Sequence, residues 1–166
     1  MIKKVFLLAA LILPMFASAQ TLKIGIINTP EIFNAMPQTA EAQKTLEENN
    51  AKYEAEYKNL LAEMEKQYND FQAMPETELP AIKERKAREL QDTQQKIQAF
   101  EQNAMQDMQK KQDELMAPIT QKIKDAIEAV GKEGGYSLIQ ELQSQLYIGA
   151  PVEDITAKVK SKLGLK

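Results

Sequence analysis

The sequence predicts an α+β protein that is mainly helical, in which a long antiparallel helical hairpin stands on a small β body. The region from Gln38 to Val130, more than ninety residues, contains no glycine and is rich in Glu, Lys, Gln, Ala, Leu and Met, which lose little entropy in a helix. Residues 74–80, Met-Pro-Glu-Thr-Glu-Leu-Pro, interrupt it, and their prolines favour a tip at which the chain folds back. The remaining segments, 20–37 and 131–166, form a body too small to bury its own apolar faces, so we expect it to oligomerise.

Apolar residues of the two arms pair in one antiparallel register. Helices of equal rise that run in opposite directions bring together residues whose numbers sum to a constant, here 153 or 154. Gln67 and Lys111 fall where a heptad repeat would have apolar residues, so we expect a narrow, coiled-coil-like seam and arms that stand in solvent. The pairs predicted to pack between the arms are Met64 with Leu90, Tyr57 with Ile97, Tyr53 with Phe100, and Leu46 with Met108.

Residues 1–19 have the pattern of a signal peptide. Lys3 and Lys4 precede an apolar run at 5–13, and the small residues Ala-Ser-Ala at 17–19 predict cleavage before Gln20. A retained membrane anchor is the alternative, but the apolar run is too short to span a bilayer comfortably. We therefore expect an exported mature chain.

Strands in the body are expected where branched and aromatic residues are dense. Residues 22–28, 136–140 and 145–148 fit this pattern. Residues 29–31, Thr-Pro-Glu, open a short helix, and Pro37 separates that helix from the first arm. The body is thus predicted to hold three short strands.

The C-terminal part of the body is predicted to end in a short helix. Val130-Gly131 is expected to stop the second arm, and Gly134-Gly135 to form a turn. Asp154 is the expected N-cap of the last helix, and Gly164 closes it. The apolar stripe of this helix is Ile155, Val159 and Leu163.

Composition argues against an enzyme. The chain has no His, Cys or Trp, so histidine-based triads, thiol nucleophiles, disulfides and nitrogen or sulfur zinc sites are excluded. Carboxylate pairs such as Glu47 with Glu48 lie on predicted exposed helix faces, where solvation explains them. The glycines near residue 131 lack the lysine and serine or threonine of a phosphate loop. We therefore expect no catalytic residue, no cofactor and no metal.

The charge of the mature chain is acidic. Without Lys3 and Lys4 it has 19 basic and 24 acidic residues, a net charge of -5. This argues against general affinity for nucleic acid or anionic membranes. Four cations follow the tip within the run Lys83-Glu84-Arg85-Lys86-Ala87-Arg88; they either meet an acidic partner or form a solvated face with the neighbouring glutamates.

Two methionines of the hairpin lie outside the predicted register. Met74 is at the tip and Met105 is on the second arm. Flexible, polarizable thioethers suit surfaces that accommodate many sequences, so these two residues are the candidate contacts to a bound polypeptide.

Three segments carry a family resemblance: residues 23–28 (Lys-Ile-Gly-Ile-Ile-Asn), 96–102 (Lys-Ile-Gln-Ala-Phe-Glu-Gln) and 152–159 (Val-Glu-Asp-Ile-Thr-Ala-Lys-Val). They resemble the Skp family of periplasmic chaperones, also called the OmpH-like family, and the resemblance covers nearly the whole mature chain. The closing segment is the most specific of the three. The resemblance implies a homotrimer in which three subunits form a β body and three helical arms enclose a cavity.

The same resemblance implies an ATP-independent holdase of the periplasm that binds unfolded outer-membrane proteins and prevents their aggregation. The alternative is a structural or adaptor coiled-coil protein of the cell envelope, with one folded partner in fixed stoichiometry. The expected partners are unfolded outer-membrane proteins and further copies of the chain, not nucleic acid. The acidic charge argues against binding to lipopolysaccharide or membranes.

Overall fold

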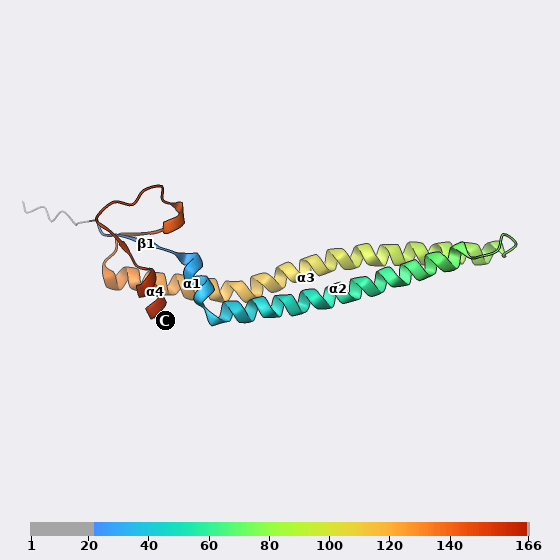
Figure 1. Ribbon diagram of the computed structural model, residues 1–166, viewed down its shortest axis with the longest axis horizontal. Helices are drawn as coiled ribbons and strands as arrows, with labels where there is room; N and C mark the ends of the chain where they lie inside the picture. Colours follow the sequence, from blue (N-terminus) through green and yellow to red (C-terminus); the bar gives the residue numbers. More distant parts are fainter. Residues whose placement is uncertain (1–21, 166) are drawn as a thin grey trace, which may run out of the picture.

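Two long helices lie side by side along an elongated molecule, with a small body at one end (Figure 1). The computed structural model describes residues 22–165, so the predicted signal peptide and its cleavage site before Gln20 lie outside the described part. The predicted fold class, a mainly helical α+β chain with a long hairpin and a small sheet, is confirmed. The elements in chain order are β1 (Ile24–Ile27), α1 (Thr29–Ala35), α2 (Pro37–Gln72), α3 (Pro80–Gly134), β2 (Leu138–Glu141), a short 3-10 helix η2 (Leu142–Ser144), β3 (Val152–Asp154) and α4 (Thr156–Lys162).

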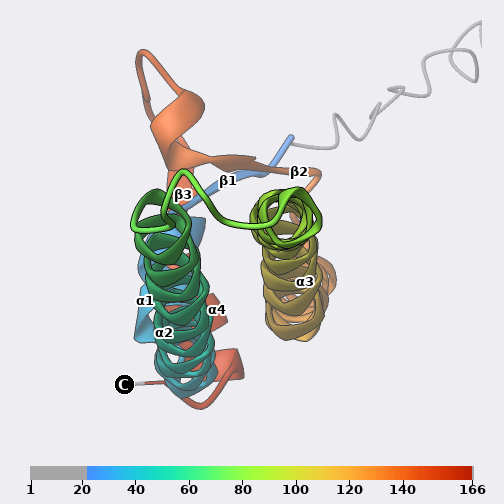
Figure 2. The same cartoon turned by 90° about the vertical axis from the view of Figure 1, so that its right-hand side faces the viewer.

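The two arms, α2 and α3, each begin at a proline. Pro37 and Pro80 occupy the first helical position, where the missing N–H has no intrahelical partner to lose. The end-on view of Figure 2 shows the two helices running alongside each other and joined by the loop at the tip. A third proline, Pro118, lies inside α3 without ending it. The hairpin therefore folds back where two prolines bracket a non-helical stretch, and a single interior proline is tolerated.

The second arm ends later than predicted. Val130-Gly131 was expected to stop it, but α3 continues to Gly134, and the residue that leaves the helix is Gly135 with a φ of 63°. The N–H of Tyr136 donates to the Gly131 carbonyl at 3.0 Å, which closes the last turn. A left-handed residue at this position strongly favours glycine, whereas Gly131 keeps ordinary helical geometry.

The sheet has three parallel strands in the order β2-β1-β3. The prediction of a strand at 145–148 was wrong: the third strand is Val152–Asp154. Both edges of β1 are occupied by β2 and β3, which leaves no partner within the chain for residues 145–148. Leu146 and Tyr147 of that loop are 106% and 85% exposed. The actual third strand was missed because it is short and carries two carboxylates.

The main core lies where the last turns of α3 meet β1, α1 and α4. Ile32, Ile155 and Val159 are fully buried there. Residues from Ile119 to Val130 of α3 join the same cluster, so one helix serves both the arm and the body. The buried members of this core are Ile27, Ile32, Met36, Ala42, Ile119, Ile123, Ala126, Val130, Ile155 and Val159.

Asp154 lies directly before the last helix. The N-cap of α4 is Ile155, one residue later than predicted, and its side chain makes no capping bond. Asp154 Oδ1 nevertheless accepts a hydrogen bond of 2.9 Å from the N–H of Thr156, the first residue of the helix. The Thr156 hydroxyl oxygen accepts a bond of 2.9 Å from the N–H of Asn28, so this turn ties α4 to the end of β1.

We predict that Asp154→Ala destabilises the body. Loss of the carboxylate leaves the Thr156 N–H without its partner, and removal of a capping side chain typically lowers the free energy of unfolding by about 0.5–2 kcal/mol. Asp154→Asn is the matched control, because an amide oxygen accepts the same bond. Urea unfolding followed by circular dichroism measures both variants. Equal stability of the alanine variant and the wild type would contradict this role for Asp154.

Candidate functional site

A stripe of half-buried side chains runs along the facing sides of the two arms. Tyr53 and Phe100 pack across it with their ring centroids 6.0 Å apart. The Tyr53 hydroxyl donates to Asp107 Oδ2 at 3.2 Å, one heptad further along α3. Burial against the opposite arm, together with the Asp107 carboxylate, raises the pKa of Tyr53 above its ordinary value. All eight residues predicted to pack between the arms lie on this stripe, half-buried or, for Ile97, buried: Leu46, Tyr53, Tyr57, Met64, Leu90, Ile97, Phe100 and Met108.

A polar pair interrupts the seam nearer the tip. Thr93 is only 2% exposed, and its hydroxyl donates to Gln67 Oε1 on the other arm at 2.8 Å. The Gln67 amide group in turn donates to Glu63 Oε1 at 3.2 Å. Gln67 is thus accommodated in a heptad position by a hydrogen bond across the arms, because an unpaired polar group there would be costly. Sequence reasoning noticed Gln67 but missed its partner Thr93.

The aromatic part of the seam opens into a shallow groove at mid-arm, with a volume of about 280 Å³. Its floor is formed by Tyr53, Tyr57, Phe100 and Ala104. The Glu101 carboxylate beside the hydroxyl of Tyr57 raises the pKa of that tyrosine. The polar lining residues are Asn50, Glu54 and Glu101. Here the arms leave aromatic surface open to solvent instead of closing over it.

The two candidate methionines are far apart. Met105 is 75% exposed on the outer surface of α3, and Met74 is half-buried in the loop after α2. From the start of α3 to Met105 the helix rises roughly 40 Å, at about 1.5 Å per residue. The structure therefore does not bring these two residues into one site. Other exposed apolar side chains on the hairpin are Leu61, Tyr68 and Leu79.

The cations after the tip have partners within the hairpin. Arg85 and Lys86 contact Glu89 at 3.2 and 2.7 Å, and Arg88 contacts Glu84 at 3.0 Å. The Lys83 ammonium group donates to the backbone carbonyl of Glu76 at 2.9 Å. Ion pairs one helical turn apart are typical of a solvated helix face, which is the second of the two interpretations of this run.

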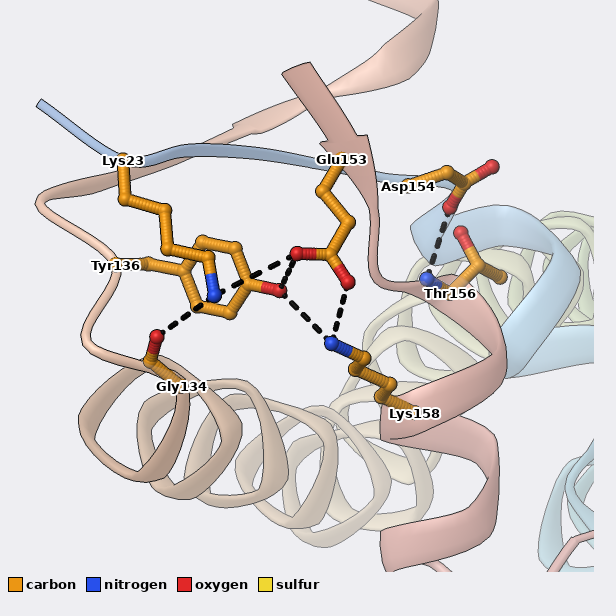
Figure 3. Close-up of polar contacts among 7 residues, drawn as sticks. All are labelled: Lys23, Gly134, Tyr136, Glu153, Asp154, Thr156 and Lys158. Carbon is orange, nitrogen blue, oxygen red and sulfur yellow. Dashed lines mark hydrogen bonds and ion pairs between the residues drawn. The ribbon is translucent and has the colours of Figure 1, made fainter. Parts of the chain in front are cut away.

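A polar network holds the body together at the base of the arms. Figure 3 shows Lys23, Tyr136, Glu153 and Lys158 converging from the start of β1, the turn after α3, β3 and α4. Tyr136 donates to Glu153 Oε2 at 2.5 Å, and Lys158 forms an ion pair with the other carboxylate oxygen. The ammonium group of Lys23 lies 4.1 Å from the centre of the Tyr136 ring and donates to the Gly134 carbonyl at 2.9 Å.

The Glu153 carboxylate is the electrostatic centre of this network. Hydrogen bonds from Lys158 and Tyr136, with the charges of Lys158 and Lys23, lower the pKa of Glu153 to about 2. The same carboxylate and the Tyr136 hydroxyl raise the pKa of Lys158. Every charged group of the network is thus paired with a protein group, which is typical of a structural cluster and leaves no free base or nucleophile.

Two searches of residues 22–165 found no other site. Within this part of the chain, no three acidic side chains gather closely enough to hold a metal ion. No helix among these residues is both long enough and apolar enough to cross a membrane. The candidate site is therefore the surface of the arms.

Comparisons with known proteins place residues 23–163 in a match to a family described as outer membrane protein (OmpH-like). A protein called Chaperone protein Skp from Yersinia enterocolitica is 30% identical over 147 residues, covering 86% of this chain and 87% of the relative. Chaperone protein Skp from Pectobacterium atrosepticum is 29% identical over 154 residues, covering 90% of each chain. The crystal structure of a candidate outer membrane chaperone (OmpH-like) from Caulobacter crescentus has a TM-score of 0.72 at 16% identity, covering 84% of this chain and 82% of that one; this likeness concerns the fold.

We predict that the stability of the body falls in acid because of Glu153. Its pKa of about 2 in the folded chain lies below the ordinary value of 4.5, so its stabilising effect is fully present above pH 4.5 and is lost as the pH falls through 2. Glu153→Gln should lower the free energy of unfolding at neutral pH and flatten its decline between pH 4.5 and 2. Tyr136→Phe, which removes one of the two principal hydrogen bonds, should have a smaller effect. Urea unfolding at a series of pH values gives this comparison, and a pH dependence identical to that of the wild type in both variants would contradict it.

Proposed function

Because the chain belongs to the OmpH-like family, we propose that it is a periplasmic chaperone that holds unfolded outer-membrane proteins in a soluble state without ATP. Arms that touch only along a narrow seam support this function. In α2 only Thr39 and Ala42 are buried, both near the body, so the rest of a 36-residue helix is half-buried or exposed. Such arms offer a large surface with scattered apolar groups, which suits many weak contacts to an extended chain.

We also propose that the body forms a homotrimer. Exposed large apolar side chains gather in sequence around β2 and the loop that follows it: Leu138, Leu146, Tyr147 and Ile148. Leu22, beside β1, is 64% exposed as well. An apolar group of this kind is unfavourable in water and supports association with further copies of the chain.

We predict that Leu146→Ser together with Tyr147→Ser converts the trimer to monomers. Full burial of each side chain contributes about 1.5–3 kcal/mol, so their joint loss weakens each protomer's contacts by about 3–6 kcal/mol. Deletion of residues 51–57 with 97–103 is the control, since it removes one heptad from each arm and leaves the body intact. Light scattering coupled to size exclusion counts the subunits. A monomeric deletion variant, or a trimeric serine variant, would refute assembly through the body.

We predict that the mature chain keeps a denatured outer-membrane β-barrel soluble when the barrel is diluted out of urea without nucleotide. Met74→Ser with Met105→Ser should weaken retention roughly tenfold, the equivalent of about 1.4 kcal/mol, without changing the subunit count. Met74→Leu with Met105→Leu keeps the apolar surface and should retain the barrel. Turbidity and fluorescence anisotropy of a labelled barrel report the two effects. Failure to retain any unfolded barrel, with tight binding to one folded envelope protein instead, would favour the adaptor function.

A further inference from the structure

The groove at mid-arm combines aromatic surface with a concentrated negative charge. Residues 45–57 of α2 contain four glutamates and Lys52, and residues 97–109 of α3 contain Glu101 and Asp107 and no cation. The groove lies between these two stretches. Elsewhere on the arms, for example after the tip, cations and carboxylates alternate and pair with one another. The negative charge of the hairpin is thus placed around its open aromatic side chains.

The carboxylates of the groove are positioned at its edges. Glu54 accepts a hydrogen bond of 3.1 Å from the side-chain amide of Asn50, one turn earlier on α2. Glu101 lies beside the Tyr57 hydroxyl on the opposite arm, and Asp107 accepts from Tyr53. The raised pKa values of both tyrosines are consistent with the negative field of these acids. Each ring is therefore flanked by a carboxylate.

This arrangement matches the chemistry of a cationic side chain on an apolar stem. Lysine and arginine lay their methylene groups along apolar surface while the charged end reaches polar atoms. Their charged groups also bind the faces of tyrosine and phenylalanine rings, and arginine forms paired hydrogen bonds with a carboxylate. A cationic segment meets all three features in the groove, whereas an acidic segment would be repelled.

We propose that this groove, formed by Tyr53, Tyr57, Phe100 and Ala104 between Glu54 and Glu101, binds lysine- and arginine-containing segments of unfolded polypeptides. The assignment rests on the proposed holdase function and specifies one class of segment that the arms engage. Met105 stands one helical turn from Glu101 on the same arm, so it extends the groove with an adaptable apolar contact. Charge complementarity selects the occupant, since an acidic rim disfavours acidic segments of the same apolar content.

The test uses the full mature chain and a pair of unstructured peptides with identical apolar residues. In one peptide every charged position is Lys or Arg, and in the other every charged position is Glu or Asp; both carry an uncharged fluorophore. Fluorescence anisotropy should show tighter binding of the basic peptide. Glu54→Gln with Glu101→Gln should weaken that binding roughly three- to tenfold, and Tyr57→Leu roughly two- to fivefold, with the acidic peptide affected less.

Glu65→Gln with Asp92→Asn is the matched control, because it removes the same charge from exposed positions nearer the tip. These residues lie more than about 12 Å along the arms from Glu54 and Glu101, beyond the screening length of about 10 Å at 0.1 M salt. The control should change the affinity for the basic peptide less than about twofold. Equal losses in the two double variants, or equal binding of the two peptides, would overturn the proposal. A changed subunit count in the Glu54 and Glu101 variant would also overturn it, since the groove would then be a contact between copies of the chain.

The same wild-type protein is assayed with a denatured β-barrel to separate this proposal from the holdase function. If the barrel is retained but the basic peptide ignores the groove variants, the groove assignment alone is wrong. If the barrel aggregates while the basic peptide binds through Glu54 and Glu101, the groove assignment stands and the holdase function is wrong. If neither binds, both are wrong.

Discussion

The packing of the last turns of α3 against β1, α1 and α4 is the constraint on which the rest of the molecule depends. Ile119, Ile123 and Val130 enter the same core as Ile155 and Val159, so the helix that forms one arm also closes the body. A helix this long is held at its base by that core and at mid-arm by a narrow seam. The arms gain rigidity from helix length and from the core, and they need not bury their outer faces to remain folded.

Much of the fold was predictable from the sequence because its strongest signals are local. The glycine-free arms, the prolines near the tip and the apolar stripe of Ile155, Val159 and Leu163 depend on residues close together in the chain. The strand at 145–148 was wrong for a tertiary reason, since β2 and β3 already occupy both edges of β1. Val152–Asp154 was missed because parallel pairing with β1, not its composition, makes it a strand. The end of α3 was misplaced because the sequence offers three glycines and only Gly135 adopts the left-handed conformation.

The candidate site was predictable only in part. A heptad pattern identifies residues that face the opposite arm, and Tyr53, Tyr57 and Phe100 all lie there. It does not reveal that their rings remain partly open, or that Thr93 satisfies the polar Gln67, because both depend on how closely the arms approach. The exposure of Met105 followed from its place outside the register, whereas the groove one turn away required the relative rotation of two helices.

The arms have two kinds of surface, and the difference follows from charge pairing. After the tip, cations and carboxylates one turn apart neutralise one another, so that stretch presents little net field and its ion pairs contribute little to stability. At mid-arm the carboxylates have few cations nearby, and they flank aromatic rings instead. A chain with an acidic hairpin is unsuited to attracting acidic polypeptides over a long range, because like charges repel. Weak apolar contacts spread along both arms, supplemented at mid-arm by attraction for cations, suit an unfolded chain that contains both apolar and basic segments.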